Sequence, residues 1–217
     1  PVPGPRPRAT AALLEYTQRY DAVYASHLWH PLFIGGIKTL AYELTEQSGW
    51  QAPDIIACPV GAGSILLGLY WGFIDLLEAG VIQTMPRLVA VQSAKVNPVL
   101  RAFKTNATSI ESVTPQKTLA EGIALPAPVR GAQVLEALRQ SNGAVIAVSE
   151  EEIVDGVTAL GSRGFCVEPT SAVVWHGLKQ FLASADLAPT AKVIALLSGH
   201  GLKATDWLSK EAPISTN

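Results

Sequence analysis

Cys58-Pro59-Val60-Gly61-Ala62-Gly63-Ser64-Ile65-Leu66-Leu67-Gly68 joins an apolar run to a helical pattern through glycines and short side chains. Residues 54–60 are predicted to form a buried strand, and residues 65–77 a helix with one apolar face. The glycines allow backbone angles that a Cβ would resist, so successive N–H groups can converge on one anion at the start of the helix. The pattern predicts a phosphate cradle, to which the Ser64 hydroxyl adds a donor. A glycine turn that serves only tight packing is the alternative.

Strands and helices alternate along the rest of the chain. Helices are predicted over residues 9–20, 32–48, 97–103, 131–140, 150–162 and 171–183, and further strands over 21–26, 87–92, 144–148, 165–167 and 192–197. Ser149 and Glu152 have the spacing of a capping box. The alternation predicts an α/β fold, three-layer α/β/α with a mostly parallel sheet. Residues 1–8 are proline-rich and are interpreted as a cut end or linker, and residues 9–217 as one α/β domain.

Composition excludes several classes of protein. The 217 residues carry a formal net charge of -2, which provides no basic footprint for nucleic acid. No apolar run reaches the roughly 20 residues that span a bilayer, and the opening has no apolar signal-peptide core. We therefore expect a cytoplasmic protein that contacts no membrane. Cys58 and Cys166 fall in predicted strands and are expected to be buried and unpaired.

Polar residues follow four of the predicted strands. They are Ser26-His27, the glycine turn, Glu168-Pro169-Thr170-Ser171, and Ser198-Gly199-His200-Gly201-Leu202-Lys203. In an open parallel sheet ligands bind beyond the carboxyl ends of the strands, so these segments are expected to face one pocket. Glu168 as a solvated turn residue, and Thr170 or Ser171 as a helix N-cap, remain open alternatives.

Metal and aromatic sites are not indicated. The histidines, His27, His30, His176 and His200, have no spacing typical of a zinc site. Trp71 and Trp175 lie in apolar helical contexts and are expected in the core rather than against a ligand.

Four segments taken in order resemble one enzyme family. They are residues 59–68, Thr118-Leu119-Ala120-Glu121-Gly122-Ile123-Ala124, Val167-Glu168-Pro169-Thr170-Ser171-Ala172, and residues 198–203. Together they resemble the C-terminal part of a threonine synthase-like enzyme, in the fold-type II (tryptophan synthase β) class of pyridoxal-phosphate enzymes. Residues 26–31 and 36–43 resemble the segment that precedes the phosphate loop of that family.

The resemblance implies roles for eight residues. The phosphate of pyridoxal phosphate would bind the amides of Gly61, Ala62 and Gly63 and the amide and hydroxyl of Ser64. The Ser198 hydroxyl would bond the pyridine nitrogen, and Glu121, Gly122 and Glu168 would lie near the ring and substrate. Ala62 departs from the family, which usually carries a polar side chain there. A small amino-acid substrate and a homodimer are also implied.

A second departure concerns lysine. The family holds its cofactor as a Schiff base on a lysine in an N-terminal segment, and no such motif occurs here. The chain has eight lysines, Lys38, Lys95, Lys104, Lys117, Lys179, Lys192, Lys203 and Lys210, and all follow the point where the family places that lysine. We therefore expect a fragment without the lysine-bearing segment and the small domain, with non-covalent cofactor binding at most and no catalytic residue of its own.

The complete enzyme is expected to convert O-phosphohomoserine to threonine and phosphate. A threonine dehydratase-like lyase is the alternative, because residues 118–124 resemble dehydratases as much as synthases. A non-catalytic binding or assembly module, and an unrelated nucleotide-binding α/β domain, are the remaining alternatives. The last of these predicts adenine-nucleotide binding and no response to pyridoxal phosphate.

Overall fold

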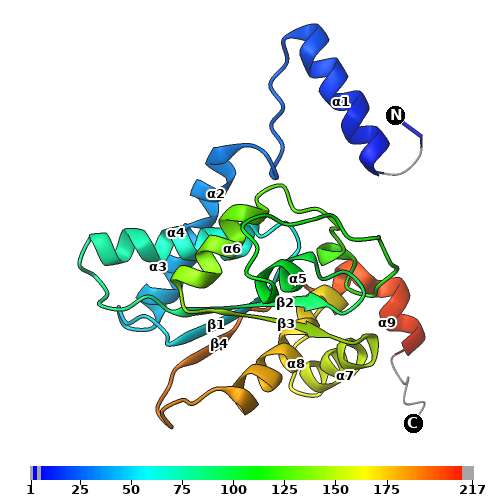
Figure 1. The fold of residues 1–217 in the computed structure, drawn as a ribbon. Coiled ribbons are helices and arrows are strands. Elements are labelled where there is room, and N and C mark those ends of the chain that lie inside the picture. Colours follow the sequence, from blue (N-terminus) through cyan, green and yellow to red (C-terminus); the bar gives the residue numbers. More distant parts are fainter. Residues whose placement is uncertain (1, 4–5, 212–217) are drawn as a thin grey trace.

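The computed structural model describes residues 2–3 and 6–211, which form a parallel sheet covered by helices (Figure 1). The strands are β1 (Ile55–Pro59), β2 (Arg87–Ser93), β3 (Ala144–Val148) and β4 (Val193–Ala195), in the order β3-β2-β1-β4, and every pair is parallel. The helices are α1 (Arg6–Tyr20), α2 (Pro31–Ile37), α3 (Thr39–Gln47), α4 (Ser64–Glu78), α5 (Pro98–Lys104), α6 (Gly131–Gln140), α7 (Glu150–Gly161), α8 (Pro169–Ser184) and α9 (Thr205–Glu211), with 3-10 turns η1 (Glu121–Ile123) and η2 (Gly201–Ala204). The predicted α/β architecture is confirmed.

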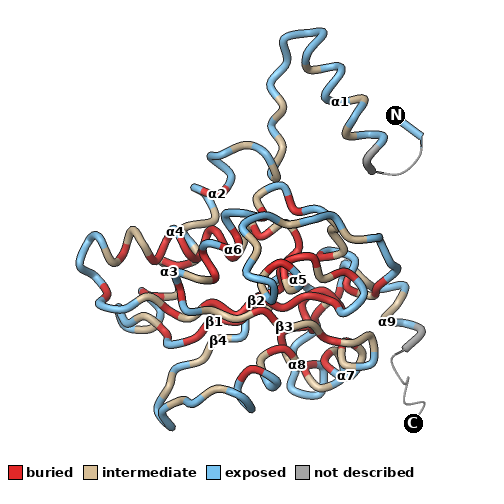
Figure 2. The backbone as a smooth tube through the Cα atoms, in the orientation of Figure 1, coloured by how far each residue is buried: buried red, intermediate tan, exposed pale blue. Residues whose placement is uncertain are grey.

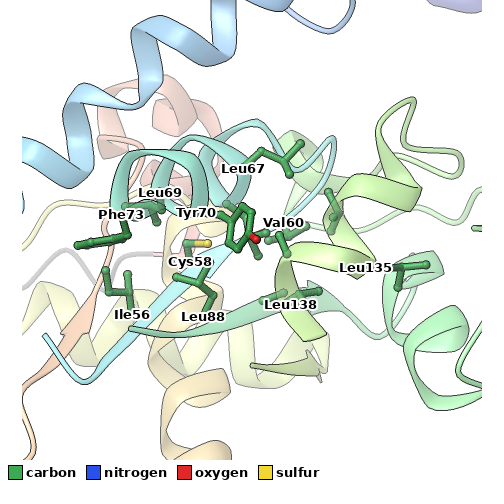
Figure 3. Close-up of a cluster of buried hydrophobic side chains, with 14 of the residues drawn as sticks. Ile56, Cys58, Val60, Leu67, Leu69, Tyr70, Phe73, Leu88, Leu135 and Leu138 are labelled. Atoms are coloured by element: carbon green, nitrogen blue, oxygen red, sulfur yellow. The ribbon is translucent and has the colours of Figure 1, made fainter. Parts of the chain in front are cut away.

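Alternate residues of β1 bury themselves against opposite layers of helices. Ile56 and Cys58 contact the layer of α3, α4 and α6, whereas Ile55 and Ala57 contact that of α7 and α8. Every residue of β1 is buried, as Figure 2 shows for the central strands. Figure 3 shows the first layer, in which Phe73 of α4 packs over Ile56. A parallel strand between two helical layers accordingly has a continuous apolar run.

The strand order places a topological switch point beside β1. The chain moves from β1 to β2 and β3 on one side, and β4 then returns to the other side of β1. The loops that follow β1 and β4 therefore leave the same edge of the sheet in opposite directions. A crevice between such loops is the usual ligand site of an open α/β sheet.

Two predicted strands do not form. Residues 22–26 have no strand assignment, and Val23 is 82% exposed because no neighbouring strand covers it. Residues 165–167 contribute only one isolated antiparallel bridge, between Val167 and His200. In both segments the local pattern favours an extended chain. A strand also needs a neighbouring strand as a hydrogen-bond partner, and in the described part of the chain the fold places none beside these segments.

The predicted helices form, with shifts at their ends. Residues 32–48 make two helices that meet at Lys38, where the Ala41 N–H donates to the Lys38 carbonyl in a tighter turn. The Lys38 carbonyl lies so close to α4 that a Cβ on Gly72 would be 2.6 Å from it. Helix α1 begins at Arg6, within the interpreted linker 1–8, and residues 1 and 4–5 of that linker lie outside the described residues.

Two expectations about burial are each wrong for one residue. Cys58 is buried, but Cys166 is exposed because its segment forms no strand of the sheet. Trp71 is 41% exposed on α4. Trp175 is partly buried and packs against a buried hydrophobic cluster, with the Arg163 and Lys179 cations over its ring. Helix α1 projects away from the sheet (Figure 1). None of the described helices is both long and apolar enough to cross a membrane.

Candidate functional site

The glycine turn leaves a set of main-chain donors unpaired. The Val60 N–H still donates to Val91, and the next amide with a protein acceptor is that of Leu67, which donates to Gly63. Within the described residues, the N–H groups of residues 61–64 and the Ser64 hydroxyl have no hydrogen-bond acceptor. These groups open the 15-residue helix α4, so the helix dipole also favours an anion at this point.

The turn requires glycine at two positions. Gly63 is the N-cap of α4 and has φ +84°, a left-handed conformation that residues with a Cβ rarely adopt. A Cβ on Gly63 would lie 2.2 Å from Cγ2 of Val134, and one on Gly61 would lie 2.8 Å from Cα of Ile123. Helix α6 and turn η1 therefore press against the cradle, and Ala62 between the two glycines is only half buried.

Turn η1 forms a second wall of the site. The Gly122 N–H donates to Oγ1 of Thr170 over 3.0 Å, which ties this turn to the first turn of α8. Thr170 is therefore not an N-cap: α8 begins at Pro169, Glu168 occupies the N-cap position, and neither side chain caps the helix. Ser171 is not a cap either, since its buried hydroxyl has no hydrogen-bond partner among the described residues.

Glu168 is mostly buried, and its interpretation as a solvated turn residue is wrong. Its side chain is 14% exposed, and Oε1 lies 2.9 Å from Nζ of Lys203. Its N–H donates to the Gly199 carbonyl, and a Cβ on Gly199 would lie 1.9 Å from Oε1. The segments at 166–168 and 199–201 are thus held together, so Ser198 and Glu168 share one wall.

One cavity of about 360 Å³ collects these groups, which is within the usual range of ligand pockets. All eight residues predicted for the site line it: Gly61, Ala62, Gly63, Ser64, Glu121, Gly122, Glu168 and Ser198. The Ser198 hydroxyl is exposed and has no partner among the described residues.

The structure adds His27, Thr170 and Lys203 to the lining. The position of His27 after a predicted strand pointed to the pocket, although that strand does not form. Thr170 and Lys203 lie within segments already singled out by sequence. Their contacts with Gly122 and Glu168 connect residues at least 35 positions apart, so no local pattern could reveal them.

The arrangement suits a phosphate monoester attached to a small polar ring. A nest of amides at a helix N-terminus binds a dianion through charge-assisted hydrogen bonds. A free hydroxyl and two carboxylates face the same space. No group of three or more side chains suited to a metal ion occurs in the described part of the chain.

Comparison with known proteins identifies relatives. A threonine synthase of Methanocaldococcus jannaschii is 31% identical over 185 residues, covering 85% of this chain and 46% of that protein. A threonine synthase of Mycobacterium bovis is 33% identical over 187 residues, covering 85% and 49% respectively. The chain thus spans about half the length of the curated relatives that it matches.

Solved structures share the fold. A threonine deaminase from T.th. superposes with a TM-score of 0.73 at 22% identity, over 91% of this chain and 61% of that one. Maize serine racemase superposes with a TM-score of 0.76 at 18% identity, over 95% and 60%. The model of the pyridoxal-phosphate dependent enzyme family matches residues 1–199. This chain therefore belongs to the pyridoxal-phosphate dependent enzymes, with threonine synthases among its relatives.

Proposed function

We propose that this chain forms the cofactor-binding part of a threonine synthase-like enzyme, whose complete form converts O-phosphohomoserine to threonine and phosphate. The observation that carries the proposal is the set of unpaired amides at residues 61–64, which open onto the cavity. Gly61 and Gly63 allow η1 and α6 to pack against the turn without a clash, and the left-handed φ of Gly63 shapes the turn. The relatives named threonine synthase support the choice of reaction.

Each lining group has a role in the proposal. The amides of residues 61–64 and the Ser64 hydroxyl hold the cofactor phosphate. The Ser198 hydroxyl bonds the pyridine nitrogen and, unlike a carboxylate, leaves that nitrogen largely unprotonated. Glu121, Gly122 and Glu168 border the ring and the substrate, and Lys203 neutralises Glu168. Pyridoxal phosphate itself supplies an electron sink for reactions of amino acids.

The test is a titration of this chain with pyridoxal phosphate, followed by absorbance and equilibrium dialysis, then borohydride treatment and mass spectrometry. We expect saturable binding that inorganic phosphate displaces, and no lysine adduct. Among the lysines that the structure describes, Lys203 alone lines the cavity, and its ammonium is paired with Glu168. A stoichiometric adduct on any lysine would contradict non-covalent binding. Binding of AMP with no response to pyridoxal phosphate would instead indicate a nucleotide-binding domain.

A matched pair of serine variants locates the ring. Ser198→Ala removes one neutral hydrogen bond, so we expect the cofactor dissociation constant to rise about 2- to 10-fold. Ser184→Ala is the control, because Ser184 ends α8 roughly 20 Å from the start of that helix at the cavity. Equal dissociation constants for the two variants would remove Ser198 from the proposed site.

A dehydratase-like lyase is the second candidate. Residues 118–124 resemble dehydratases, and within the described residues Lys203 is the one lysine or arginine that lines the cavity. Its ammonium is already paired with Glu168, so among these residues no free cation remains there for a substrate phosphate. The complete protein distinguishes the two: release of phosphate from O-phosphohomoserine supports the synthase, whereas conversion of threonine to a 2-oxo acid and ammonia supports the lyase.

A further inference from the structure

Glu150 binds one end of the wall that faces the cradle, although its own side chain does not line the cavity. Its Oε2 accepts the Leu119 N–H over 2.7 Å. Its Oε1 accepts the Thr118 hydroxyl over 2.6 Å and the Ser93 hydroxyl over 3.1 Å. Three donors from two distant segments thus converge on one carboxylate.

The carboxylate and its partners are well placed for a tight clamp. Thr118 is 4% exposed and Ser93 is fully buried, so their hydroxyls have little access to competing water. Hydrogen bonds to an ionised carboxylate are stronger than those between neutral groups. Glu150 is the first residue of α7, where the helix dipole favours a negative charge. The capping box of Ser149 and Glu152 fixes that end of the helix.

The clamped segment continues directly into the cradle. The Ala120 N–H donates to the Thr118 hydroxyl over 3.2 Å, so the hydrogen-bonded segment extends one residue further, to Ala120. The Gly122 N–H then donates to Thr170, so residues 118–122 are tied at both ends. Directly after the second tie, Cα of Ile123 lies 2.8 Å from the place of a Cβ on Gly61. Release of the Glu150 end would therefore free the wall to move away from the glycine turn.

We propose that Glu150 is a positioning residue that holds residues 118–123 against the glycine turn and so sets the shape of the phosphate cradle. The inference rests on the proposed function for its ligand, but the clamp is defined by protein contacts alone. Its effect is therefore measurable with and without a cofactor.

The first measurement is hydrogen exchange on this chain and on Glu150→Ala, each at the same interval below its own melting temperature. We expect exchange about tenfold faster in two peptides, residues 118–125 and residues 65–71. The second peptide begins the hydrogen-bonded part of α4, where the Leu67 N–H donates to the Gly63 carbonyl, and it has no hydrogen bond to Glu150. Glu151→Ala is the matched control, since it removes a charge of the same sign from the same helical turn at an exposed position, and its own side-chain hydrogen bond is with Ser149 rather than with residues 118–119. Its exchange in the two peptides should equal that of the parent chain.

Glu150→Gln separates geometry from charge and guards against a variant that fails to fold. Its amide oxygen can still accept the Leu119 N–H, and its amide nitrogen can donate to the two hydroxyls, so we expect an intermediate effect. Faster exchange confined to residues 118–120, exchange raised equally throughout the chain, or no change in residues 65–71 would overturn the proposal.

The second measurement is the dissociation constant for pyridoxal phosphate. We expect it to rise about tenfold in Glu150→Ala and to stay unchanged in Glu151→Ala. If the parent chain binds no cofactor but Glu150→Ala loosens both peptides, the proposed function fails and the positioning role stands. If the parent chain binds the cofactor and Glu150→Ala changes neither exchange nor affinity, the positioning role fails alone.

Discussion

Gly63→Ala is the substitution that tests the cradle most directly. An alanine would have to keep φ +84°, which costs about 1–2 kcal/mol for a residue with a Cβ. Its Cβ would also lie 2.2 Å from Cγ2 of Val134, and overpacking of this kind typically costs about 1–3 kcal/mol. We therefore expect the free energy of unfolding to fall by about 2–5 kcal/mol, a large part of the about 5–15 kcal/mol that stabilises a typical domain.

Two further variants separate the cost of the left-handed backbone from the cost of the clash with Val134. Gly80 has φ +69° with nothing near the position of a Cβ, so Gly80→Ala should cost only the about 1–2 kcal/mol of backbone strain. In a Val134→Ala background the clash disappears, so Gly63→Ala should cost no more there than Gly80→Ala does in the parent chain. Urea denaturation followed by circular dichroism measures each value.

Ligand binding completes the test. If the left-handed turn aims the amides at a phosphate, Gly63→Ala loses hydrogen bonds to a charged group, each worth about 1.5–3 kcal/mol, and affinity for pyridoxal phosphate falls about 10- to 100-fold. Gly80→Ala should leave the affinity unchanged. A Gly63→Ala protein that is as stable as Gly80→Ala, or that binds the cofactor as tightly as the parent chain, would refute the reasoning.

Asp75→Asn should lower stability at pH 7 by at most about 1 kcal/mol, because its ion pair with Lys38 is about one third exposed. Burial alone would raise the pKa of Asp75, but the hydrogen bonds from Lys38 and Tyr42 lower it below 3.8. The ion pair therefore stabilises the folded state above that pH. In thermal melts, the difference in stability between the parent chain and Asp75→Asn should shrink as the pH falls toward 3. Iodoacetamide should modify Cys166 and spare Cys58 in the native protein, as peptide mass spectrometry would show, since Cys58 is fully buried and burial raises the pKa of its thiol to about 12. The thiol of Cys58 ionises near pH 9.0 in the unfolded chain but stays neutral at that pH in the folded one. The free energy of unfolding should therefore fall as the pH rises from 9 toward 12, and it should fall less in Cys58→Ala. Modification of Cys58 at a rate equal to that of Cys166 would contradict its burial.

Sequence reasoning was most reliable where structure depends on neighbours along the chain. The capping box at Ser149 formed because its two hydrogen bonds lie within four residues. The continuous apolar run of β1 was recognisable because a strand covered on both faces leaves no alternation to interpret. The same reasoning failed for residues 21–26, where an extended chain found no partner strand, and for Cys166, where an apolar residue lay in a segment that joins no sheet.

That a glycine turn joins a buried strand to a helix could be inferred from the order of residues alone, because backbone sterics and helix geometry act over a few residues. Which groups meet that turn depends instead on the folded arrangement of the whole chain. The contacts of Glu168 with Lys203, of Gly122 with Thr170 and of Glu150 with residues 118–119 follow from the order β3-β2-β1-β4. That order depends on how both faces of the sheet bury their side chains at once, which is a property of no single segment.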